Sequence, residues 1–161
     1  MNISEVIAKE VLDSRGSPTL EVTVRAGDLS ASAKVPSGKS TGKREALELR
    51  DPDGRGVTQA IDSVNRVIGP VIVGHELDSV AVDASMRELD GTELKSHLGA
   101  NAMLGVSFAM LRLDAMALGV PLWRRIADLA GTEPGFPHLF VNMMNGGAHS
   151  NFTLPFQEYI V

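Results

Sequence analysis

The chain has 161 residues, of which 43% are hydrophobic and 22% are charged, with a formal net charge of −5 at pH 7 and no cysteine. This composition is typical of a globular domain and excludes a disordered chain, a disulfide framework and any site built on cysteine. An acidic chain without a block of basic residues lacks the charge pattern of nucleic-acid-binding proteins, so we expect no nucleic-acid partner. No apolar run approaches the ~20 residues that span a bilayer, and no apolar leader follows a basic N-terminus. We therefore expect a cytoplasmic protein without a membrane span.

The first part of the chain shows the two-residue alternation of half-buried β-strands. Apolar and polar residues alternate over residues 19–25 and again over residues 30–35, with turn residues between the two runs. Such a pattern predicts a β-hairpin. Residues 3–11 form a third predicted strand, so we expect a three-stranded antiparallel meander.

After Gly56 the apolar residues change to helical spacing. This spacing predicts four helices, over residues 57–68, 79–89, 100–118 and 122–129. We expect the dipeptide Gly69-Pro70 to stop the first helix. The third helix is apolar on almost every side, which predicts a central position. The predicted fold class is therefore α+β, a meander followed by a helical bundle.

A loop-like stretch over residues 131–137 is the best candidate for a domain boundary. We assign residues 1–133 to the α+β domain, and residues 134–161 to a linker and the start of a second domain. A polar, glycine-rich loop covers residues 145–151, and residues 156–161 read as one strand at the end of the chain. Because a strand without a successor cannot complete a sheet, we expect the sequence to stop where the second domain begins.

The glycine-rich loop over residues 36–43 partly fits the phosphate-binding loop of nucleotide hydrolases. Such a loop follows a buried parallel strand and opens a long helix. Here the preceding strand alternates as a hairpin strand does, and Gly42 interrupts any helix in its first turn. The pattern therefore disfavours a nucleotide hydrolase, and a plain surface loop stays open as the alternative.

A second glycine-rich loop places His149 close in sequence to Gln157 and Glu158. Gly146 and Gly147 allow backbone N–H groups to approach an anionic ligand closely. A lone histidine is more often structural than functional, so spacing alone leaves both readings of His149 open.

Six spaced segments, in chain order, resemble the N-terminal signatures of enolases. They are residues 11–19, 35–42, 45–51, 88–92, 98–107, and 145–149 with 157–158. Together they span essentially the whole chain, which makes the resemblance far more specific than any single motif. It implies the α+β N-terminal domain of an enolase, followed by an eight-stranded α/β barrel. Only the first barrel strand, around residues 157–161, is expected in this sequence.

Enolases are hydro-lyases of glycolysis and gluconeogenesis, also called phosphopyruvate hydratases, and they interconvert 2-phosphoglycerate and phosphoenolpyruvate with Mg²⁺. The resemblance implies this activity and a homo-oligomer, a dimer or larger, for the complete enzyme. It also implies that Ser40 ligates Mg²⁺ as its loop closes over substrate, with Gly38 and Gly42 as the hinges. Lys39 departs from the small residue usual in the family, which puts a bulky cation into this loop.

The resemblance gives three further residues roles at the substrate. His149 would lie beside the substrate phosphate and the leaving hydroxyl as a catalytic and substrate-binding residue. Gln157 and Glu158 would line the substrate pocket, with Glu158 assisting the acid side of the chemistry.

The metal carboxylates, the base lysine and the main acid glutamate of enolases lie on later barrel strands, outside this sequence. We therefore expect this chain alone neither to bind Mg²⁺ tightly nor to catalyse the reaction. The alternative is a non-catalytic interaction domain left after loss of the barrel. That alternative predicts an autonomous fold that does not respond to phosphoglycerate.

Overall fold

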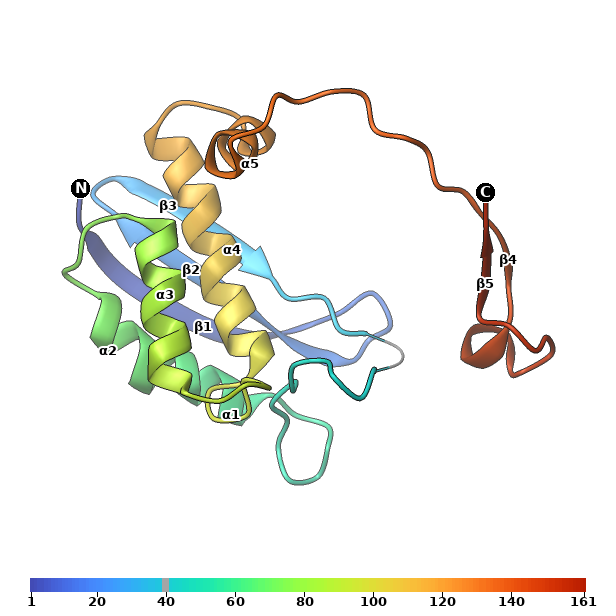
Figure 1. The fold of residues 1–161 in the computed structure, drawn as a ribbon. Coiled ribbons are helices and arrows are strands. Elements are labelled where there is room, and N and C mark those ends of the chain that lie inside the picture. The colour runs from blue at the N-terminus through green and yellow to red at the C-terminus, as the bar shows by residue number, and fades with distance from the viewer. Residues whose placement is uncertain (39–40) are drawn as a thin grey trace. The chain divides into compact units, whose positions relative to one another are not determined.

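The structure is a computed structural model that describes residues 1–38 and 41–161, without the side chain of His149. It divides into two compact units, Met1–Ala130 and Gly131–Val161. Each unit is described by itself below (Figure 1).

The first unit is built on the predicted meander. Strands β1 (Ile3–Leu12), β2 (Pro18–Ala26) and β3 (Leu29–Lys34) form an antiparallel sheet in the order β1-β2-β3. Alternate residues of β2, Leu20, Val22 and Val24, are fully buried, because one face of the sheet carries the core. The prediction of a three-stranded meander is confirmed.

Helix α4 (Ala100–Ala117) packs on β2 and β3 and covers the apolar face of the sheet (Figure 1). A Cβ on Gly105 would lie 2.5 Å from the Cγ2 of Val22, so glycine permits this close approach. Val106 is fully buried, whereas Leu104 is 42% exposed. The prediction of a central helix is therefore correct for one face only, because the composition of α4 does not distinguish its buried side from its open side.

Two further helices pack on α4. They are α3 (Ser79–Asp90) and α5 (Leu122–Ala130), both close to their predicted bounds. α3 begins after Asp78, whose carboxylate accepts two backbone N–H bonds, and ends at Gly91, whose φ of 66° suits glycine. Among the described residues no single helix is long and apolar enough to cross a membrane; α4 and α5 pass that test only as a pair, bent by 101°.

The predicted stop at Gly69-Pro70 is wrong. The first helical region continues in three pieces: α1 (Thr58–Asp62), the π-helical η1 (Ser63–Ile68) and α2 (Gly69–Ile72). The N–H of Gly69 bonds to the carbonyl of Val64, five residues back, which closes the π turn. Pro70 then lies in the first turn of α2, where its missing N–H needs no partner. The helix therefore accommodates the proline and ends at Ile72, since Val73 is already extended.

The second unit contains an unpredicted strand. Strand β4 (Asn142–Asn145) pairs antiparallel with β5 (Glu158–Ile160), and the 3₁₀ turn η2 (Gly147–Ser150) lies between them. The predicted single strand over residues 156–161 is shorter than expected, and it has a partner within the chain. Alternation is too short to detect in a strand of four residues, which explains why β4 was missed.

Candidate functional site

The predicted site residues fall into two groups, one in each unit. Gly38 and Gly42 belong to the loop that follows β3 in the first unit. His149, Gln157 and Glu158 belong to the second unit. Ser40, the predicted metal ligand, lies outside the described residues, as does Lys39.

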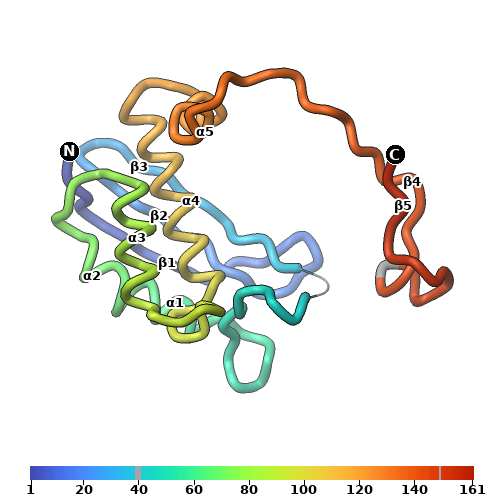
Figure 2. The backbone as a smooth tube through the Cα atoms, viewed as in Figure 1, coloured from blue at the N-terminus to red at the C-terminus, as the bar shows by residue number. Residues whose placement is uncertain are grey.

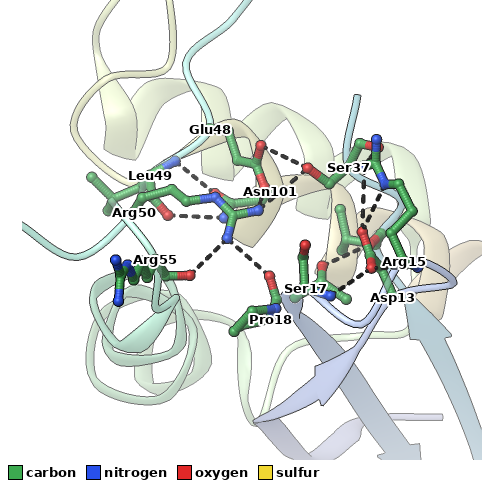
Figure 3. A network of polar contacts seen from close by, with 12 residues as sticks. Asp13, Arg15, Ser17, Pro18, Ser37, Glu48, Leu49, Arg50, Arg55 and Asn101 are labelled. Atoms are coloured by element: carbon green, nitrogen blue, oxygen red, sulfur yellow. Dashed lines mark hydrogen bonds and ion pairs between the residues drawn. The ribbon is translucent and has the colours of Figure 1, made fainter. Parts of the chain in front are cut away.

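The turn between β1 and β2 holds the start of this loop. The Oδ1 of Asp13 accepts the backbone N–H groups of Arg15 and Ser17, both at 2.8 Å. These bonds, that from Ser17 foremost, lower the pKa of Asp13. The guanidinium of Arg15 lies 3.3 Å from the Asp13 carboxylate, and it donates a 2.7 Å hydrogen bond to the carbonyl of Ser37 (Figure 3). An ordered arginine therefore anchors the backbone one residue before Gly38.

The side chain of Ser37 is held as well, by the pair Glu48 and Arg50. The Ser37 hydroxyl donates to the Glu48 carboxylate at 3.1 Å and accepts from Arg50 at 3.3 Å. Arg50 and Glu48 form a 2.6 Å ion pair, and Arg50 also donates to the carbonyls of Pro18 and Arg55 (Figure 3). A guanidinium with a planar set of donors is suited to bridging several acceptors in this way.

We call Arg15, Ser37, Glu48 and Arg50 the Ser37 clasp. Its members come from three separate stretches of chain: the β1–β2 turn, the exit of β3 and the irregular segment before α1. Figure 2 traces that irregular segment between β3 and α1. Two charge pairs, Arg15 with Asp13 and Arg50 with Glu48, neutralise the clasp locally. The clasp therefore fixes the geometry of Ser37 without leaving an unbalanced charge at this point.

Leu49, between the two charged clasp residues, is tied to the start of α4. Its N–H donates to the Oδ1 of Asn101, and its carbonyl accepts from the Nδ2 of the same side chain, both at 3.0 Å. Asn101 is 2% exposed. A Cβ on Gly99 would lie 2.5 Å from the Cβ of Leu49, so this contact also depends on a glycine with a φ of 92°. The clasp thus rests on the core of the first unit.

The far end of the loop is held by a local turn. The N–H of Gly42 donates to the carboxylate of Glu45 at 2.8 Å, and the N–H of Glu45 donates to the carbonyl of Gly42 at 3.1 Å. Gly38 and Gly42 therefore each lie beside an anchored position, Ser37 on one side and Glu45 on the other.

In the second unit, Gln157 packs against the turn that carries His149. The N–H of Gly146 donates to the Gln157 carbonyl at 2.7 Å, and the N–H of Ala148 donates to the Gln157 side-chain oxygen at 3.2 Å. Gly147 has a φ of 51°, and a Cβ there would overlap the Gln157 amide. Glu158 follows as the first residue of β5, in register with Asn145. The structure thus brings Gln157 and the backbone around His149 together.

The comparisons with known proteins agree with the motifs. The family model for the enolase N-terminal domain matches residues 3–126. This chain belongs to the enolase family. Over 168 aligned positions it is 49% identical to Enolase B of Dictyostelium discoideum. The alignment covers 38% of the length of that protein. The same alignment covers 100% of this chain.

Two members of the Ser37 clasp lie within one enolase motif, but their contacts could not be read from the sequence. Glu48 and Arg50 lie in the matched segment 45–51, yet no role was predicted for either. The sequence offered one signal for this pair. Two opposite charges lie two residues apart, in a stretch that has neither helical nor strand periodicity. Such a pair indicates a fixed irregular segment, but its partner Ser37 cannot be found without the fold.

Proposed function

We propose that this chain is the N-terminal part of an enolase that interconverts 2-phosphoglycerate and phosphoenolpyruvate. The observation that carries the proposal is the 49% identity to an enolase across the whole of this chain. The anchored ends of the loop over residues 36–43 support it, because a loop that closes over a substrate needs fixed positions on which to turn. We further propose a cytoplasmic homo-oligomer.

The reaction removes a proton from the carbon next to a carboxylate and expels hydroxide from the neighbouring carbon. The C–H electron pair forms the new C=C bond, and the departing hydroxide takes up a proton to become water. In the proposed enzyme His149 contacts the phosphate and the leaving hydroxyl, and Gln157 orients the substrate. Glu158 assists protonation of the leaving hydroxide. Closure of the loop at Gly38 and Gly42 excludes water from this chemistry.

Mg²⁺ would supply the positive charge that stabilises the doubly charged carboxylate intermediate. Among residues 1–38 and 41–161, no three His, Asp or Glu side chains gather into a group that could hold a metal ion. The described residues alone therefore do not fit a Mg²⁺ site. In the proposed enzyme Ser40 contributes one ligand, and the carboxylates come from outside this chain.

The test compares two proteins, the 161-residue chain and the complete polypeptide that carries it. We expect phosphoenolpyruvate to form from 2-phosphoglycerate and Mg²⁺ with the complete polypeptide and not with the chain alone. His149→Ala and Glu158→Gln should each lower kcat/KM, and Ser40→Ala should raise the Mg²⁺ concentration required. Arg66→Gln, an exposed change on η1, is the matched control and should leave activity unchanged.

Each result decides a separate part of the proposal. Clear turnover by the 161-residue chain alone would contradict its being an incomplete enzyme. A complete polypeptide that folds but forms no phosphoenolpyruvate would refute the enolase assignment and favour the interaction domain.

A further inference from the structure

A cavity of about 230 Å³ lies between α3 and α4. Its walls are mainly apolar and include Met86, Met103 and Leu104. Its only charged lining residues among those described are Asp83, Arg87 and Lys95. None of these residues belongs to the Ser37 clasp or to the second unit. The volume is below that of typical drug-sized sites, so the cavity suits a small ligand.

Asp83 lines the cavity, and one of its two carboxylate oxygens is already held by α4. Its Oδ2 accepts a 3.0 Å hydrogen bond from the hydroxyl of Ser107 on α4. Its Oδ1 is buried and has no hydrogen-bond partner among the described residues. Burial raises the pKa of Asp83, and the Ser107 hydrogen bond and the nearby charge of Arg87 oppose that rise. A cationic ligand would therefore compete with Ser107 and Arg87 for this carboxylate.

The two cations are presented differently. Arg87 follows Asp83 by one turn of α3 and is exposed to solvent. Lys95 donates a 2.6 Å bond to the carbonyl of Thr92, and an ammonium group has three donors, so two are left for a ligand. Two cations and one carboxylate give the described lining a net positive charge, which favours an anionic ligand over a cationic one.

We propose that this cavity binds a small molecule with a short apolar chain and one carboxylate. The apolar chain contacts Met86, Met103 and Leu104, and the carboxylate pairs with Arg87 and Lys95. Carboxylates bind guanidinium and ammonium groups through charge-assisted hydrogen bonds, which gives the site its preference for this group. The site does not depend on enolase activity, because none of its residues has a role in the proposed reaction.

The test is a titration of the isotopically labelled 161-residue chain, followed by amide chemical shifts. The probes are hexanoate, hexylammonium and hexanol, which share an apolar chain and differ in charge. We expect hexanoate to shift the amides of Ala46, Ala100 and Met103 in a saturable way. Arg87→Gln should weaken hexanoate binding about tenfold, since a hydrogen bond to a charged group is lost. Arg66→Gln, the matched control, should leave binding unchanged.

Three results would overturn the proposal. Equal binding of hexanol and hexanoate would show an apolar cavity without preference for an anion. Tighter binding of hexylammonium, abolished by Asp83→Asn, would show that Asp83 is the anchor. No saturable shift with hexanoate would show that the cavity takes no such ligand. Arg87 is exposed, so its substitution leaves the fold intact and the comparison stays interpretable.

Discussion

Two asparagines make the same paired bonds to backbone in different surroundings, and they provide a matched test. Asn101, 2% exposed, bonds to the N–H and carbonyl of Leu49, both at 3.0 Å. Asn65, which is exposed, bonds to the N–H and carbonyl of Ala8 at 2.7 and 3.1 Å. Replacing either residue with alanine removes two hydrogen bonds. Because Asn65 is itself exposed, its removal opens a path for water to the backbone of the buried Ala8, whereas removal of the buried Asn101 opens no such path to Leu49.

We expect Asn101→Ala to lower the free energy of unfolding by about 2–4 kcal/mol, because it strands two backbone groups away from water. Asn65→Ala should cost about 1 kcal/mol. The measurement is urea unfolding of each variant, followed by far-ultraviolet circular dichroism. Equal losses of stability in the two variants would refute the reasoning, since burial would then not set the cost.

Three further predictions concern packing, pH and the clasp. Gly105→Ala should lower the free energy of unfolding by about 1–3 kcal/mol, because its Cβ would lie 2.5 Å from Val22; unchanged stability in urea would contradict this packing. The lowered pKa of Asp13 means that its stabilising effect is present at neutral pH and is lost as the pH falls through that pKa, below 3.8. The stability difference between the parent chain and Asp13→Asn should therefore shrink in acid, and a difference that grows would have the wrong sign. Arg50→Met should speed tryptic cleavage after Lys43, and an unchanged rate would show that the clasp does not hold the loop.

Much of the fold could be predicted because its signals are local. The alternation around Leu20, Val22 and Val24 predicted β2, and the helical spacing over residues 79–89 predicted α3 (Ser79–Asp90). The continuation of the first helical region through Pro70 could not be predicted. It depends on the π-type hydrogen bond from the N–H of Gly69 to the carbonyl five residues earlier, which has no recognisable sequence pattern. Strand β4 is too short for its alternation to be recognised.

Only those residues of the candidate site that lie in the enolase motifs could be predicted. The family resemblance named Gly38, Gly42 and the residues around His149, and their roles stay predictions. The contacts of Ser37 depend on three chain segments meeting at one end of the sheet, which is a property of the fold. Arg15 anchors the loop backbone directly, through its bond to the carbonyl of Ser37.

The irregular segment before α1 has a consequence for the order in which the molecule assembles. Leu49 bonds to Asn101 instead of to a neighbouring strand, and Arg50 bonds across to Pro18. These partners come into position only after α4 has docked on the sheet, so we expect the segment to become ordered late in folding. In native-state hydrogen exchange its amides should open at a lower free energy than those of β2. The segment that carries Glu48 and Arg50 can therefore loosen and re-form while the core beneath it stays intact.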